Sequence, residues 1–219
     1  MTVITRQPFL VRDHYAFGYW LSDHARFFEA ARLQLVELEF VASRVKEQWP
    51  IPEGETLRDG DEHPELLALV KKRDLLSDSV KIFSAMAVEG FLNYYGVVRL
   101  GEDEYVTHFE RLGLVPKIRV LLLICDSLSV ASNDTLIKVL DRIAKRRNTL
   151  VHPKARELPG YLSAEERGGD KVPEVAQEAV ADMEQFFREF VTAVPQVGHL
   201  VPQVDGESMG QGHRIPDVG

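Results

Sequence analysis

Cysteine is almost missing from this sequence, since Cys125 is the only one among 219 residues. No intramolecular disulfide and no cysteine-based zinc cluster can therefore form. Cys125 follows the apolar run 120–124, which favours a small buried hydrophobic side chain over a nucleophile. A single unpaired cysteine is typical of a reducing compartment, and we expect a cytoplasmic protein.

Long hydrophobic runs are also missing. No segment approaches the roughly 18 consecutive apolar residues of a membrane-spanning helix. The first six residues lack the charged, apolar and small-residue order of a signal peptide. We therefore expect no membrane partner.

The motifs of several enzyme classes do not occur. The sequence has no Gly-rich phosphate loop ending in Gly-Lys-Ser/Thr, no dinucleotide fingerprint and no His-Glu-x-x-His. No histidine stands three residues after a glutamate, the spacing that carboxylate-bridged metal bundles use. Asp13-His14, Asp23-His24 and Glu62-His63 are adjacent pairs, whose members point to different faces of a helix. We expect neither a metal nor a cofactor.

Positive charge is scarce, because 34 acidic residues against 26 basic ones give a formal net charge of −8. A negatively charged surface repels nucleic acid on average. Any contact with RNA must therefore come from a local basic patch.

Apolar residues recur at helical spacing along most of the chain. The spacing predicts helices over residues 11–47, 64–95, 104–112, 117–127, 132–152 and 173–194. The first of these is either one long helix or a broken pair, in which Ser22-Asp23 could cap a new helix at His24. We find no strand alternation, and residues 97–100, after Gly96, are the one candidate for an extended piece. The predicted class is all-α, an up-and-down bundle of about five to seven helices.

Composition divides the chain into three parts. Residues 1–60 are expected to form a helical extension followed by a loop rich in proline, glycine and acid. Residues 61–194 hold the main helical domain. Residues 195–219 have no period and are expected to form a poorly ordered tail.

The polar residues of greatest chemical interest lie near the end of the helix predicted over 132–152. Asn148 and His152 are four residues apart and share a helix face. Histidine titrates near neutrality, while Arg147 carries a permanent charge on a planar fork that suits two phosphate oxygens. An acid or base beside a phosphate clamp is a minimal set for phosphodiester chemistry. The alternative is structural, because Asn and His also satisfy the last carbonyls of a helix.

The same helix carries the required basic patch. Its cations recur at i, i+4, i+7 and i+8, and a further lysine follows the helix end; they are Lys138, Arg142, Lys145, Arg146 and Lys154. This stripe is a candidate RNA-binding surface. The alternative is the solvated face of an amphipathic helix.

Arg147, four intervening residues and His152 at the end of a late helix resemble the R-x4-6-H signature of the HEPN family. The segment 85–93, with Glu89 and Asn93 among apolar residues, is similar to an early helix of that family. Residues 109–112 and 115–117 resemble its linking region. The resemblance covers roughly residues 71–194.

The resemblance implies a HEPN-like helical fold and one of two activities. HEPN proteins include metal-independent endoribonucleases, often toxins or antiviral effectors, which pair as homodimers so that two Arg/His sets face each other. In such an enzyme His152 would be the general acid or base, Arg147 would stabilise the phosphate, and Asn148 would orient one of them. Glu89 and Asn93 would be supporting residues, with a structural role as the alternative.

Two further functions stay open. A catalytically silent HEPN-like module would bind RNA or a protein partner, such as an antitoxin or effector, and the acidic surface and unmatched N-terminal helix favour it. In an unrelated helical bundle the spacing of Arg147 and His152 would be accidental.

Overall fold

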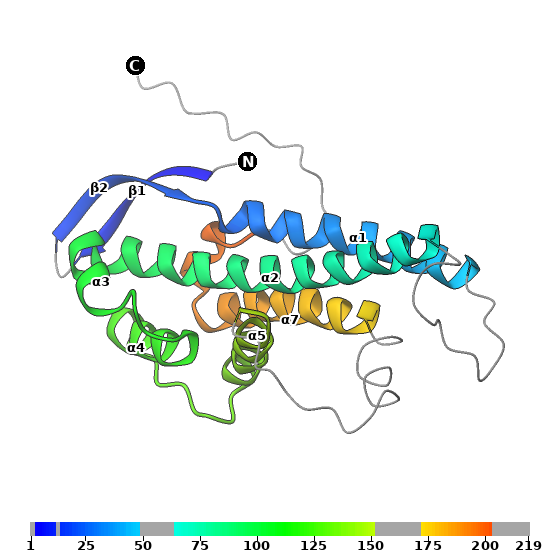
Figure 1. Cartoon of the computed structure of the whole chain (residues 1–219). Helices are drawn as coiled ribbons and strands as arrows, with labels where there is room; N and C mark the ends of the chain where they lie inside the picture. The colour runs from blue at the N-terminus through cyan, green and yellow to red at the C-terminus, as the bar shows by residue number, and fades with distance from the viewer. Residues whose placement is uncertain (1–2, 12–13, 49–63, 152–171, 203–219) are drawn as a thin grey trace, which may run out of the picture.

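The computed structural model describes residues 3–11, 14–48, 64–151 and 172–202. Two long helices, α1 (His24–Gln48) and α2 (Pro64–Leu100), pack along each other, and α7 (Val172–Ala193) packs against both. The helix α5 (Thr135–Val151) lies against α7 and α2. Figure 1 shows α2 running through the middle of the bundle, with α1 on one side and α5 on the other.

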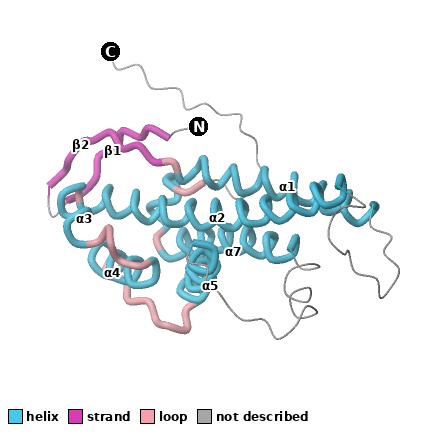
Figure 2. Tube along the Cα trace, viewed as in Figure 1, coloured by secondary structure: helices cyan, strands magenta, loops and turns pink. Residues whose placement is uncertain are grey.

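Short elements complete the described chain. Figure 2 shows α3 (Glu102–His108) and α4 (Leu114–Asp126) together at the end of α2, while the 3-10 helix η1 (Pro195–Leu200) follows α7. The described part thus holds six α-helices, one 3-10 helix and a two-stranded hairpin, and the predicted all-α bundle is confirmed. Among these helices, no segment combines the length and the hydropathy that a membrane span requires.

Aromatic side chains fill the centre of the bundle. Phe91 of α2 meets the ring edges of Phe186, Phe187 and Phe190 of α7, and all four side chains are fully buried. Burial of one such side chain contributes about 2 kcal/mol, and edge-to-face contacts add to it. The apolar stripe of α7 is therefore the surface on which α2 is held.

The predicted helix over residues 11–47 is wrong in its first third, before His24. Residues Val3–Val11 and His14–Ser22 form the antiparallel strands β1 and β2, and α1 begins only at His24. Tyr15, Phe17 and Tyr19 alternate with period two, and aromatic residues favour strands. The sequence therefore held a strand signal that the helical interpretation overlooked.

The first helix is part of the bundle rather than an extension beside it. Phe28, Ala31 and Leu38 of α1 are fully buried in the main core. The predicted tail also begins too early, because Val197 and Leu200 of η1 are buried and His24 Nε2 donates to the Leu200 carbonyl at 2.9 Å.

The predicted helix end at Gly96 is wrong, and so is the extended piece over 97–100. The helix α2 continues through Gly96 to Leu100, and Gly101, with φ of 85°, follows it. A Cβ atom on Gly96 would lie 2.3 Å from the Tyr105 ring. Gly96 therefore permits α3 to approach α2 closely, and the left-handed Gly101 ends the helix.

Candidate functional site

The candidate site is built on α5, whose two faces have different tasks. Asp134 Oδ1 accepts the Leu136 N–H at 2.9 Å and so caps the start of the helix. Leu136, Leu140 and Ile143 are buried in the core. The arginines and lysines of α5 lie outside this buried face. Some of them reach the neighbouring helices α2 and α7, and the others face solvent.

The end of α5 coincides with the edge of the described chain. The helix ends at Val151, so His152 and Lys154 lie outside the described residues. The assignments of His152 as acid or base and of Lys154 to the RNA-binding stripe therefore stay predictions.

Three predicted site residues come together between α2 and α5. The Arg147 Nη1–H group donates to Asn148 Oδ1 at 3.2 Å, and Arg147 Nη2 lies 3.7 Å from Glu89 Oε2. The side chains of Arg147 and Glu89 are 37% and 35% exposed. Since a guanidinium has five N–H donors, these contacts leave Arg147 able to bind an anion from solvent.

Asn93 lies one turn beyond Glu89 on α2 and belongs to a different set of contacts. Its Oδ1 atom accepts hydrogen bonds from the Tyr105 hydroxyl at 2.6 Å and from Lys117 Nζ at 2.7 Å. Lys117 Nζ also donates to the Glu110 carbonyl at 3.0 Å. Asn93 thus links α2, α3 and α4, which is the structural alternative for this residue.

Lys117 and Tyr105 were not among the site residues predicted from the sequence. Lys117 is 1% exposed, and burial lowers its pKa, although Glu89 and Glu110 act in the opposite direction. For the Tyr105 hydroxyl, whose charged form is an anion, burial has the opposite sign: it raises the pKa, and Glu110 and Glu89 raise it further. The only sequence signal for Lys117 was its place in segment 115–117, which resembles the HEPN linking region.

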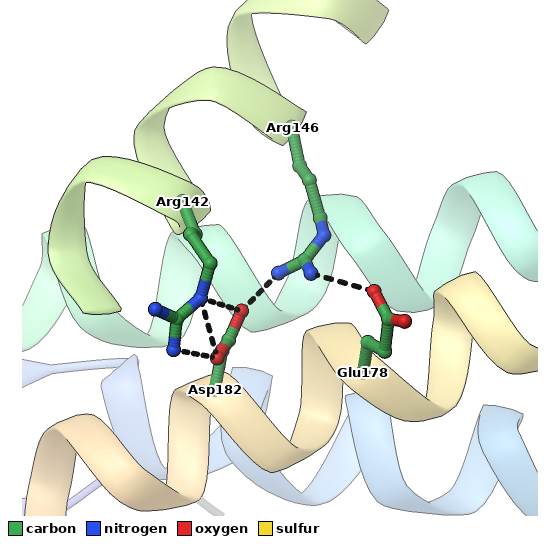
Figure 3. Close-up of polar contacts among 4 residues, drawn as sticks. All are labelled: Arg142, Arg146, Glu178 and Asp182. Carbon is green, nitrogen blue, oxygen red and sulfur yellow. Dashed lines mark hydrogen bonds and ion pairs between the residues drawn. The ribbon is translucent and has the colours of Figure 1, made fainter. Parts of the chain in front are cut away.

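Two arginines of the predicted RNA-binding stripe are committed to α7. Arg142 donates to both oxygens of Asp182, through Nε at 3.1 Å and through Nη2 at 2.6 Å. Arg146 donates to Asp182 as well and to Glu178 Oε2 at 3.0 Å. Figure 3 shows both guanidinium groups pointing down from α5 onto these two carboxylates.

The charge on Asp182 is shared between both arginines. Burial alone would raise the pKa of this 7%-exposed carboxylate, but the hydrogen bonds from Arg142 and Arg146 outweigh burial and lower it. The hydrogen bond to Asp182 in turn raises the pKa of Arg142, although burial opposes it. We call Arg142, Arg146, Glu178 and Asp182 the α5–α7 clamp.

The other two described cations of the stripe face solvent. Lys145 is exposed and pairs with Asp141 one turn earlier, at 2.6 Å, and Lys138 is exposed as well. Exposed pairs of this kind contribute little to stability and exchange readily with other ions. Lys138 and Lys145 are therefore the described part of the stripe that can meet an anionic partner.

A second polar cluster, which the sequence did not indicate, closes the end of α4. Asp126 accepts hydrogen bonds from Tyr95, from Arg99 Nη1 at 2.6 Å and from Gln196 Nε2 at 3.0 Å. Burial raises the pKa of the neighbouring Cys125 to about 11, Asp126 adds to the effect and Arg99 opposes it. The thiol is therefore protonated at neutral pH, which fits the expected non-nucleophilic role.

Comparisons of the chain with models of known families, with curated proteins and with solved structures gave no match. Within the described ranges, His, Cys, Asp and Glu side chains form no group of three that could hold a metal ion. The function is therefore argued from the residues around Arg147.

Proposed function

We propose that this chain is a HEPN-like, metal-independent endoribonuclease that cleaves RNA through Arg147, Asn148 and His152. One observation carries the proposal: Arg147 is held loosely by Glu89 and Asn148 at a half-exposed position, while its neighbours Arg142 and Arg146 are locked in the α5–α7 clamp. An arginine with free donors at a helix end is suited to a phosphate.

The proposed reaction needs no group beyond the chain and the RNA. The 2′-hydroxyl loses its proton to a general base and attacks the adjacent phosphorus. The bond to the 5′-oxygen breaks, that oxygen takes up a proton, and a cyclic phosphate remains. His152 exchanges these protons, Arg147 stabilises the charge that develops on the phosphate, and Asn148 orients Arg147.

The acid beside the site has a role in this proposal. Glu89 lies close enough to attract the Arg147 side chain without a hydrogen bond at 3.7 Å. A loose ion pair keeps the guanidinium near the end of α5 and gives it up when a phosphate arrives. Glu89 is therefore a positioning residue.

The proposal includes a substrate surface and an assembly. Lys138 and Lys145, with Lys154 beyond the helix, supply the positive charge for the RNA backbone. The proposed location is the cytoplasm, a reducing compartment that suits the single unpaired cysteine. The HEPN resemblance further suggests a homodimer; each protomer carries its own Arg147, Asn148 and His152 because the three lie in one short segment.

A second candidate function is a catalytically silent HEPN-like module that binds RNA or a protein. The α5–α7 clamp favours it, because Asp182 and Glu178 neutralise two of the four described cations of the stripe. Such a module would retain the fold and lack cleavage.

The experiment compares cleavage of single-stranded RNA in EDTA by the parent, Arg147→Ala and His152→Ala. Arg188→Ala is the matched control, since Arg188 is an exposed arginine on α7 paired only loosely with Glu184, at 3.8 Å. We expect cleavage to a cyclic phosphate by the parent and the control, and a loss of about a hundredfold or more in the two site variants. Binding without cleavage by the parent would support the silent module, and equal cleavage by all four proteins would contradict both.

A further inference from the structure

The helix α1 is apolar on two sides, although only one side is buried. Its inner side contributes Phe28, Leu38 and other residues to the core. On its outer side Leu33, Val36 and Phe40 are 68%, 66% and 62% exposed. These three residues follow one another at intervals of three and four, so they form one continuous stripe. A contiguous apolar stripe on a polar surface is typical of an interaction site.

The charges toward the two ends of this stripe are arranged symmetrically about its centre. At the centre itself Glu37 is exposed on the same face and pairs with Lys72 of α2 at 2.6 Å. Glu29 stands four residues before Leu33, and Arg44 stands four residues after Phe40. One step further out the signs reverse, because Arg26 stands seven residues before Leu33 and Glu47 stands seven residues after Phe40. At 3.6 residues per turn these positions share the face of the stripe. All four charged residues are exposed.

This order is self-complementary when a second copy runs in the opposite direction. A two-fold axis between Val36 and Glu37 places Leu33 of one copy opposite Phe40 of the other. It also places Val36 opposite Glu37, whose charge is balanced by Lys72 of its own copy. The same axis places Glu29 opposite Arg44 and Arg26 opposite Glu47. A two-fold interface requires one patch to fit itself in this way, and opposite charges fix its register.

We propose that the chain forms a homodimer through α1, with the outer stripe Leu33, Val36 and Phe40 packed antiparallel against the same stripe of a second copy. The inner charges are available for it, because neither Glu29 nor Arg44 forms an ion pair with another described residue. Arg26 pairs with Asp23 at 3.0 Å, but both side chains are well exposed and the pair can be shared. An unrelated protein partner would not require the symmetric order of charges.

The assignment also fixes where the Arg147 sites lie in the dimer. In Figure 1 α1 and α5 occupy opposite sides of α2 and α7. A dimer through α1 therefore leaves both Arg147 sites on its outer faces. This differs from the facing arrangement of two Arg/His sets, and the α1 dimer does not depend on the proposed ribonuclease activity.

The first test measures the mass of the full chain by sedimentation equilibrium over a range of concentrations. We expect the parent to dimerise and Leu33→Glu/Phe40→Glu to stay monomeric, with at least a tenfold weaker association. Leu123→Glu/Ile124→Glu is the matched control, because these two side chains are 57% and 53% exposed. They belong to α4, which lies away from α1 in Figure 1. Circular dichroism checks that each variant retains its helices.

The second test examines the register through charge reversal. Glu29→Arg places two arginines opposite each other at both ends of the interface, and Arg44→Glu places two glutamates there. Each single variant should weaken dimerisation by about tenfold. The double variant Glu29→Arg/Arg44→Glu restores opposite charges at both ends and should recover the parent's association.

Three outcomes would overturn the proposal. The parent is monomeric at every concentration, the stripe variant dimerises as well as the parent, or the double charge reversal is no better than the single ones. The second outcome would place the dimer on another surface. The third would refute the antiparallel register.

Discussion

Two neighbouring arginines of one helix have opposite structural roles. Arg146 is 20% exposed and donates to two carboxylates of α7, whereas Arg147 is 37% exposed and lies 3.7 Å from one half-exposed carboxylate of α2. A rotation of 100° around α5 separates a locked side chain from an open one. Sequence spacing shows which cations share a helix face, but the acids on the neighbouring helices decide which of them are available.

The same difference divides the two asparagines of the predicted site. Asn93 accepts from Tyr105 and from the buried Lys117, while Asn148 is exposed and accepts only from Arg147 among the described contacts. Asn93, Arg142 and Arg146 form the locked set, and Glu89, Arg147 and Asn148 form the open set. Substitutions in the locked set should lower the stability of the fold, and substitutions in the open set should lower RNA cleavage instead.

The largest effect on stability is expected from the locked asparagine. Asn93→Leu removes the acceptor shared by two buried donors and should lower the free energy of unfolding by about 3 kcal/mol. Asn148→Leu is the matched control and should change it by about 0.5 kcal/mol or less, because the side chain is exposed. Urea unfolding measures both, and similar values for the two variants would refute the division.

A somewhat smaller loss is expected from the α5–α7 clamp. Asp182→Asn leaves two arginines without their common carboxylate, and we expect a loss of about 2 kcal/mol, reduced because Arg142 is partly solvated. Glu184→Gln on the same helix is the control, since its ion pairs are long, at 3.7 and 3.8 Å. Thermal unfolding should show a clear decrease for the first variant and almost none for the second.

The contribution of Asp182 should also depend on pH. The hydrogen bonds from both arginines lower its pKa below the ordinary value of 3.8. The folded state therefore releases this proton more readily than the unfolded state, and the stabilisation is present above that value. It is lost as the pH falls through the lowered pKa of the folded state. The stability difference between parent and Asp182→Asn should shrink below pH 3.8; a difference that grows there would contradict the assignment.

The smallest effect on stability is expected at Glu89. Glu89→Gln removes an ion pair at 3.7 Å between half-exposed groups and an attraction for the charged form of the buried Lys117. We expect a loss of about 1 kcal/mol or less. Its effect should instead appear in RNA cleavage, because Arg147 loses the group that positions it. A stability loss comparable to that of Asp182→Asn would move Glu89 into the locked set.

The helical class was predictable because apolar periodicity is local, and Leu136, Leu140 and Ile143 are buried as their spacing indicates. The hairpin β1–β2 was missed although Tyr15, Phe17 and Tyr19 alternate with period two, and only its pairing depends on residues far apart in the sequence. Gly96 was predicted to end a helix because glycine often does so. The actual reason for a glycine here, the Tyr105 ring that lies where a Cβ atom would be, cannot be read from the sequence.

The candidate site was predictable in part for the same reason. Glu89 was named with Arg147, and the two lie together, although they come from different helices. The partners of Arg142 and Arg146 could not be read from the helix that carries them, because Asp182 stands 40 and 36 residues further along the chain. A stripe of cations thus predicts a basic surface only where no acid of another helix covers it.

The difference between an open Arg147 and a locked Arg146 should be clearest in the RNA cleavage rate per folded molecule of Arg147→Lys beside Arg146→Lys. Lysine keeps the charge and removes the planar fork. We expect Arg147→Lys to lose most of the cleavage rate and Arg146→Lys to retain it. Equal rates in both variants, or the greater loss in Arg146→Lys, would contradict the proposed difference.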